Sequence, residues 1–173
     1  MTGIFLSGCI EGRVPPEKEK FFFDLKGFFE KEASLLNEQK ITAEKYLISE
    51  KDTQKLILSS LNWEKEFAPF INSDINKPAW KGSYNVDSVL KDQKIQSVIY
   101  TSLEKNLPVK QIQIHFNNDN VSNVYIENAT KNYVYNSGQI LSYYAKKGFA
   151  IEGEQDIVLG KDLHYRVIVN FIE

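Results

Sequence analysis

The fold class that we expect for this chain is decided by residues 112–126, which read IQIHFNNDNVSNVYI. In the first part of this stretch, apolar and polar residues alternate with a period of two, which is typical of a strand with one buried face. Four turn-prone residues, Asn117 to Asn120, come next, and a second apolar run centred on Tyr125 follows them. Two such runs joined by a short turn-prone segment predict an antiparallel hairpin.

The same two-residue period continues through the C-terminal half, in segments near 95–103, 132–136 and 162–171. The last segment is the clearest, because its residues separate into an apolar face and a polar face. The apolar face carries Leu163, Tyr165, Val167, Val169 and Phe171, and the polar face carries His164, Arg166 and Asn170. Residues 137–148 fit either a short helix or a hairpin arm, and the pattern does not separate the two.

The N-terminal half has the period of a helix instead. Between Phe21 and Gln39, apolar residues recur at spacings of three and four: Phe22, Leu25, Phe29, Ala33 and Leu36, widened by Phe21, Phe28 and Leu35. So broad an apolar face predicts packing on a sheet or on a second helix, with docking on a membrane surface as the alternative. Gly27 costs about 1 kcal/mol relative to Ala inside a helix, so we interpret it as a close approach to another element.

A second, short helix is predicted to begin after Asn62, whose side chain can cap it. Pro69 should kink or end this helix, because proline lacks the backbone N–H that a helix interior needs. Residues 41–48 read best as a strand, and the assignment of the remaining residues up to 58 stays open. Residues 72–83 are typical of an ordered loop held by Trp80.

We therefore expect an α+β fold, in which an N-terminal amphipathic helix and a second short helix cover one face of a twisted antiparallel sheet of about five to seven strands. The 173 residues, 42% of them hydrophobic, are enough for one domain. We place that domain at residues 21–173 and a separate N-terminal segment at residues 1–20.

The composition excludes several functional classes. The chain has 21 Lys and Arg against 23 Asp and Glu, a net charge of −2, and so lacks the basic field expected of a nucleic-acid-binding protein. Its single cysteine, Cys9, excludes an internal disulfide and a multi-cysteine metal site. We expect no cofactor and no nucleic-acid partner.

The most specific short motif is Leu6-Ser7-Gly8-Cys9, preceded by Ile4 and Phe5. An aliphatic residue, a small residue and a glycine before a cysteine resemble the lipobox of bacterial lipoproteins. The resemblance implies that residues 1–8 are removed and that Cys9 is lipidated through its thiol. A signal peptide carries a basic start and about 7–15 apolar residues, so this interpretation expects a longer signal before Met1. The alternative is a cytoplasmic protein with a short polar N-terminus.

Residues 10–20 are mostly charged and contain the pair Pro15-Pro16, which stiffens the chain toward polyproline II. Such a segment is typical of a tether between an anchor and a folded domain. The sorting habit of the lipoproteins that this chain resembles favours the outer membrane, because Ile10 rather than an aspartate follows Cys9. The expected location is therefore the cell envelope, at the outer membrane or in the periplasm, with the protein held by its lipid anchor. No later apolar run approaches the ~20 residues of a spanning helix, so attachment would be by lipid alone.

His115 and His164 are the first candidates for chemistry, because both occupy polar positions of predicted strands. If those strands were neighbours, the two rings could share a face with Asp119, Glu127 or Arg166. A metal site would still need three or four converging ligands. We therefore interpret both histidines as exposed sheet residues.

The remaining candidates are two carboxylate pairs, Glu152 with Glu154 and Glu64 with Asp74, and a basic and aromatic group, Lys146, Lys147, Tyr143 and Tyr144. Carboxylate pairs depend on three-dimensional spacing, which a sequence does not give. The lysines are interpreted as a solvated face rather than a nucleic-acid contact. Neither a nucleophile elbow nor a glycine-rich phosphate loop occurs.

Three functional hypotheses follow. The first is a lipid-anchored envelope protein that acts as a non-catalytic binding or assembly module, similar in layout to many small bacterial lipoproteins. The second is a carrier that holds a hydrophobic ligand between the aromatic helix and a curved sheet, although aromatic cores are mostly filled. The third is a small cytoplasmic or envelope enzyme, which would need the two histidines to converge with carboxylates in one pocket. The lack of catalytic signatures favours a protein that is not an enzyme.

Overall fold

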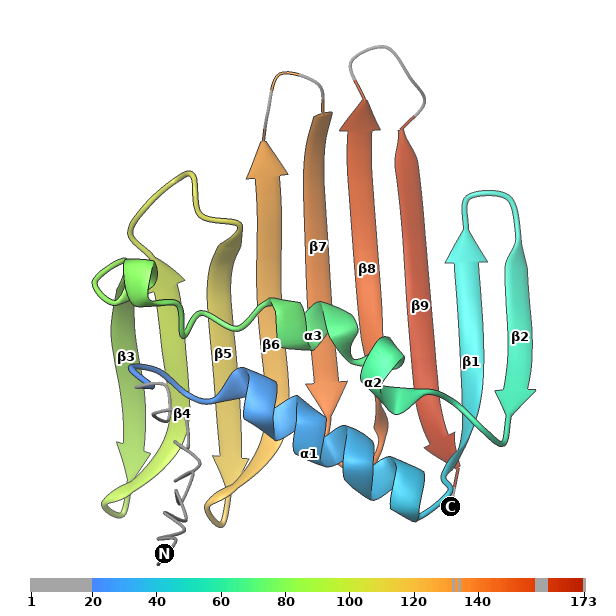
Figure 1. Ribbon diagram of the computed structural model, residues 1–173, viewed down its shortest axis with the longest axis horizontal. Coiled ribbons are helices and arrows are strands. Elements are labelled where there is room, and N and C mark those ends of the chain that lie inside the picture. Colours follow the sequence, from blue (N-terminus) through green and yellow to red (C-terminus); the bar gives the residue numbers. More distant parts are fainter. Residues whose placement is uncertain (1–19, 132, 134, 158–161, 173) are drawn as a thin grey trace, which may run out of the picture.

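The fold is one antiparallel sheet with the helices packed on one of its faces (Figure 1). The computed structural model describes residues 20–131, 133, 135–157 and 162–172. Within these residues the sheet has nine strands: β1 Thr42–Ser49, β2 Thr53–Leu58, β3 Tyr84–Lys91, β4 Lys94–Ser102, β5 Val109–Asn117, β6 Asn120–Lys131, β7 Tyr135–Tyr144, β8 Gly148–Ile157 and β9 Leu163–Ile172. The helices are α1 Leu25–Glu38, α2 Trp63–Glu66 and α3 Ala68–Asn72, with a 3-10 turn η1 at Pro78–Trp80.

The strand order is β2-β1-β9-β8-β7-β6-β5-β4-β3, so β3 to β9 form a continuous meander and the first hairpin lies beside β9. The α+β layout and the antiparallel sheet are confirmed, but the expected strand number of about five to seven was too low. The edge strands β2 and β3 account for the difference, because nearly all of their residues are exposed on both faces. An edge strand of this kind carries no apolar alternation for a sequence pattern to detect.

The hairpin predicted within residues 112–126 is confirmed. β5 and β6 are joined through Asn118 and Asp119, whose φ angles are 49° and 64°. Positive φ at both central residues is what a two-residue type I′ turn requires, and Asn and Asp tolerate it better than other non-glycine residues. Residues 135–144 form strand β7, so the hairpin-arm alternative for that segment is the correct one.

The N-terminal helix is confirmed, although it begins at Leu25 rather than at Phe21. Asp24 is its N-cap, and the carboxylate accepts a hydrogen bond of 3.1 Å from the Gly27 backbone N–H. A Cβ on Gly27 would lie 2.1 Å from Oδ2 of Asp24. The close approach at Gly27 is therefore to the capping side chain of the same helix, and the expected contact with another element was wrong.

The second predicted helix also begins where expected. The Oδ1 atom of Asn62 accepts a 3.0 Å hydrogen bond from the Lys65 backbone N–H, which caps α2. The helix then breaks at Phe67, and Pro69 lies in the first turn of α3. The proline therefore divides one predicted helix into two short ones, as its missing N–H requires.

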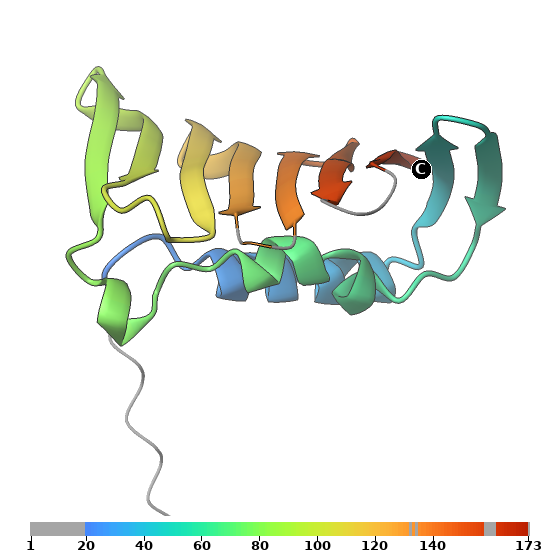
Figure 2. The ribbon, with the colours of Figure 1, turned by 90° about the horizontal axis from the view of Figure 1, so that it is seen from above.

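The core lies between these helices and the sheet (Figure 2). It is a cluster of aromatic rings in mutual contact, and the members Phe29, Phe67, Phe70, Tyr143 and Phe149 are at most 2% exposed. Burial raises the pKa of the Tyr143 phenol, and its hydrogen bond to the Glu32 carboxylate raises that pKa further. These rings fill the layer in which the carrier hypothesis would place its ligand.

Candidate binding surface on the uncovered sheet face

The sheet face opposite the helices is covered by no element among the described residues (Figure 2). On β8, Phe149 and Ile151 are buried on the helix side. Because side chains alternate along a strand, Glu152 and Glu154 project from the other face. The pairing places Glu152 opposite Arg166, and Glu154 opposite His164 on β9.

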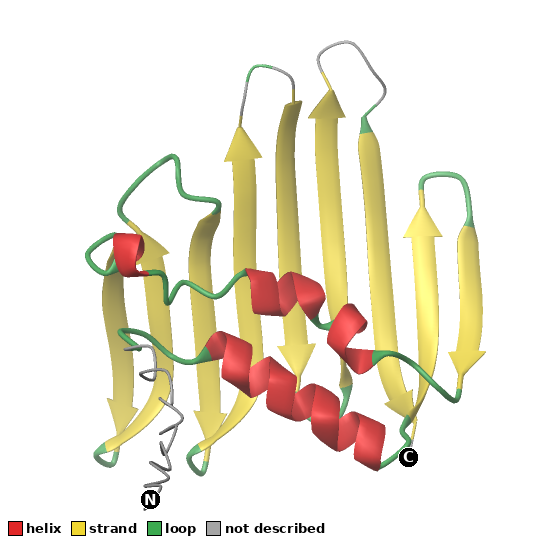
Figure 3. Cartoon of the chain, viewed as in Figure 1, coloured by secondary structure: helices red, strands yellow, loops and turns green. Residues whose placement is uncertain are grey.

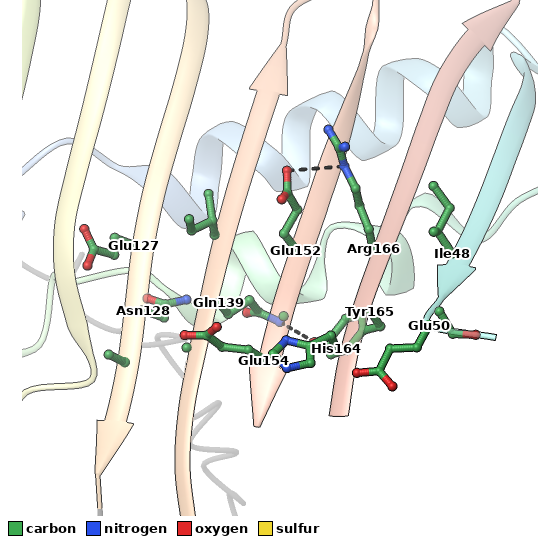
Figure 4. Close-up of a pocket in the computed structure, with 15 residues that line it drawn as sticks. Ile48, Glu50, Glu127, Asn128, Gln139, Glu152, Glu154, His164, Tyr165 and Arg166 are labelled. Atoms are coloured by element: carbon green, nitrogen blue, oxygen red, sulfur yellow. Dashed lines mark hydrogen bonds and ion pairs between the residues drawn. The ribbon is translucent and has the colours of Figure 1, made fainter. Parts of the chain in front are cut away.

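This uncovered face is hollowed into an open groove of about 530 Å³ across β6, β7, β8, β9 and the end of β1 (Figure 4). We call it the face groove. Its floor is made of small or apolar residues, including Ala129, Gly138 and Ile140. Its charged lining residues are Glu50, Glu127, Glu152, Glu154 and Arg166, accompanied by His164.

Gly138 shapes the floor of the groove. A Cβ at this position would lie 2.9 Å from Oε1 of the Glu154 side chain. Because glycine has no Cβ, the Glu154 carboxylate can lie across β7 toward the middle of the groove. Sequence reasoning did not single out Gly138 or Ile140, since only the strand register brings them beside the charged residues.

An ion pair within the groove joins Arg166 Nε to Glu152 Oε1 at 3.3 Å (Figure 4). Both side chains are 50% exposed, and exposed pairs of this kind contribute only about 0–1 kcal/mol. A partner could therefore replace the pair at little cost. Four carboxylates against one guanidinium leave the groove with an excess of negative charge.

The two histidines do not meet. His164 lines the face groove on β9, whereas His115 lies on β5, opposite Asn123 of β6 and Ser97 of β4. Three strands separate β5 from β9 in the sheet. Of the residues proposed to join the histidines, Glu127 and Arg166 lie in the groove with His164, and Asp119 pairs with Lys94 at 3.3 Å in the distant hairpin.

The other sequence candidates divide in the same way. Glu152 and Glu154 share the groove face, as the period-two pattern predicted. Glu64 lies in α2 and Asp74 follows α3, and no hydrogen bond joins them within the described part of the chain. Tyr143 is buried in the core while Tyr144 is 48% exposed, so the two rings take opposite faces of β7. Lys146 and Lys147 lie in the turn between β7 and β8. Cys9, the proposed lipidation site, lies outside the described residues.

Among the residues that the structure describes, no three His, Cys, Asp or Glu side chains converge as metal ligands would. The helices of this part of the chain are also too short or too polar for any one of them to cross a bilayer. Comparisons with known protein families, with curated proteins and with solved structures gave no significant match. Function must therefore be argued from the surface itself.

Proposed function

We propose that this protein is a lipid-anchored component of the bacterial cell envelope that acts as a non-catalytic binding or assembly module. Its binding surface is the uncovered sheet face, centred on the face groove. The observation that carries this proposal is a nine-stranded sheet packed with helices on one face only, whose other face is hollowed and charged. Sheets of this kind usually leave one face to water or to a partner.

The charge of the groove specifies the partner. Among the residues that the structure describes, Glu127 and Glu154 form no ion pair, and Arg166 of the groove lining is paired with Glu152. A cationic protein segment rich in Lys or Arg would match this potential and would be steered toward the face. The floor at Ile140, which is 38% exposed, would accept the apolar stems of such side chains.

A photo-crosslinking residue tests the surface. One is placed at Ile140 in the groove and, as a matched control, one at Leu35 on α1, because both native side chains are 38% exposed. We expect the Ile140 probe to give a discrete adduct in intact cells that weakens at high salt and in the Glu127→Gln, Glu154→Gln double variant. Equal adducts from both positions, or an adduct indifferent to both changes, would remove the support for this face.

The anchor rests on the lipobox-like motif and needs its own test. The protein, expressed from its own locus with whatever precedes Met1, is labelled with an alkyne-bearing fatty acid in the wild type and in a Cys9→Ser variant. We expect label and membrane fractionation in the wild type and loss of both in the variant. An unlabelled wild-type protein in the soluble fraction would instead support the cytoplasmic alternative.

A further inference from the structure

The strand at one end of the sheet has an open edge. β3 is last in the strand order and pairs, within the described part of the chain, with β4 alone (Figure 3). The backbone N–H and C=O groups on its outer side therefore meet no further strand, which is the arrangement that accepts an added strand. Apart from Tyr84, every residue of β3 is exposed, so no helix or loop of the described residues covers this strand.

The exposed side chains of β3 include three apolar ones. Val86, Val89 and Leu90 are between 51% and 61% exposed, and Ile95, which lies opposite Leu90 on β4, is 47% exposed. Proteins protect open edges from pairing with short strands, prolines or lysines. The other edge strand, β2, has this protection, because it is only six residues long and carries Lys55. The longer and more apolar β3 is therefore the edge better suited to an added strand.

One face of β3 carries a negative and a positive charge. Val86 faces the helix side, because its partner on β4, Tyr100, belongs to the core. Since side chains alternate along a strand, Asp87, Val89 and Lys91 project from the uncovered face. The two charges lie at equal distances on either side of Val89, so the strand is complementary in charge to an antiparallel copy of itself.

Charge selects one register for such a pair. Two copies of one strand that pair antiparallel are related by a two-fold axis, and the axis passes through one residue position. With the axis at Val89, Asp87 of each copy lies opposite Lys91 of the other. An axis at Asp87 or at Lys91 would oppose like charges, which is destabilising. In the register centred on Val89, the Leu90 side chains are diagonal neighbours on the helix side, a spacing of about 7–8 Å that long side chains bridge.

This register also fits the rest of the fold. It overlaps residues 87–91, which lie next to the turn formed by Asp92 and Gln93. The 3-10 turn η1 precedes β3, at the opposite end of the strand (Figure 1). Because the two copies run antiparallel and overlap only near this turn, η1 of each copy lies beyond the end of the partner strand, where it does not obstruct the pairing.

We propose that β3 pairs with β3 of a second copy of this chain, in the antiparallel register centred on Val89. The two sheets then form one continuous sheet whose uncovered faces lie on the same side. Ion pairs between Asp87 and Lys91 close both ends of the join, and the two Val89 side chains pack on each other at its centre. This interface goes beyond the binding function proposed for the face groove, because two strands lie between β3 and β6, the nearest strand of the groove.

Cysteine crosslinking of the full chain tests the register. In a Cys9→Ser background, Val89→Cys places two thiols opposite each other, where the Cα atoms lie about 4.5–5.5 Å apart, a spacing that a disulfide accepts. Val86→Cys is the matched control, because the native side chains are similarly exposed and the two copies of residue 86 would lie about 20 Å apart. On mild oxidation we expect a covalent dimer from Val89→Cys alone. Equal yields from the two variants, or no dimer from Val89→Cys, would overturn the proposal.

Charge reversal tests the same pairing without a crosslink. In sedimentation velocity, the wild-type chain should shift from monomer to dimer as its concentration rises through the micromolar range. Asp87→Lys and Lys91→Asp should each weaken the dimer about tenfold, since each opposes like charges at two places, and the double variant should restore it. Ile57→Lys, on the exposed β2 edge, should leave the dimer unchanged.

Three results of the sedimentation experiment would refute the interface: a monomer at every concentration, a double variant that stays as weak as the single ones, or a dimer weakened by Ile57→Lys. The last result would indicate head-to-tail pairing of β2 with β3 instead. Crosslinking at Ile140 reports on the face groove and is independent of all three.

Discussion

Replacing Phe29 by Ala tests whether the layer between helices and sheet is filled. The Phe29 side chain is fully buried in α1, and the ring centroids of Phe70, Phe28, Phe67 and Tyr143 lie 4.6, 5.0, 5.1 and 5.2 Å from its own. Large-to-small changes of this kind cost about 3–5 kcal/mol when the site cannot collapse. Edge-to-face ring pairs contribute about 0.5–1.5 kcal/mol more each. The measured range for large-to-small changes already includes such ring pairs. Because two of the four contacts have that geometry, we expect a loss in the upper part of that range, about 4–5 kcal/mol.

Urea unfolding followed by tryptophan fluorescence measures this loss as a lower midpoint at an unchanged slope. Leu35→Ala, on the exposed side of the same helix, serves as the control and should cost about 0.5 kcal/mol or less. A loss below about 1.5 kcal/mol for Phe29→Ala would mean that the ring is loosely packed, because the same change in a filled core costs about 3–5 kcal/mol. That result would refute the filled-core argument and revive the hypothesis of a carrier with a cavity in this layer.

Three further predictions concern the fold. Burial raises the pKa of Tyr84 from 10.0 to about 12. As the pH rises, the unfolded chain therefore releases this proton before the folded chain does, and the free energy of unfolding falls between the unfolded and the folded pKa. In urea unfolding across this pH range, Tyr84→Phe should lose less stability than the wild type. Asp119→Gly should raise the free energy of unfolding by about 0.5–1 kcal/mol, because φ is 64° at this position and glycine adopts it without strain. A lower urea midpoint in this variant would show that the exposed contact with Lys94 matters more. Gly153→Ala should cost about 1–3 kcal/mol, since the Tyr165 ring occupies the position of the new Cβ, whereas Gly82→Ala, with no atom within 4 Å, should be neutral in thermal melts.

The elements of the fold were predictable wherever one face of an element is buried. The β9 segment separates its apolar face from His164 and Arg166, and the structure places those two residues on the uncovered side. The cap at Asn62 and the break at Pro69 were predictable because they depend on local backbone chemistry. Strands β2 and β3 were not, because edge strands exposed on both faces leave no periodic signal.

The candidate sites could be predicted only in part. Period two placed Glu152 and Glu154 on one face, but the neighbours that turn them into a groove come from the register of four other strands. The Asn128 amide in the groove lining is hydrogen-bonded to Ser73, which lies 55 positions away in the chain. No local pattern relates residues so far apart.

By itself, the sequence determined the alternation of strand faces, the hairpin turn, the helix caps and a lipobox-like motif at Cys9, because each depends on neighbouring residues. The tertiary structure alone decided that His115 and His164 lie on strands with three others between them, that Gly138 makes room for Glu154, and that Tyr165 rests on Gly153. These relations follow from which strands pair and in which register, and that choice is made by burial of the whole apolar face against the helices.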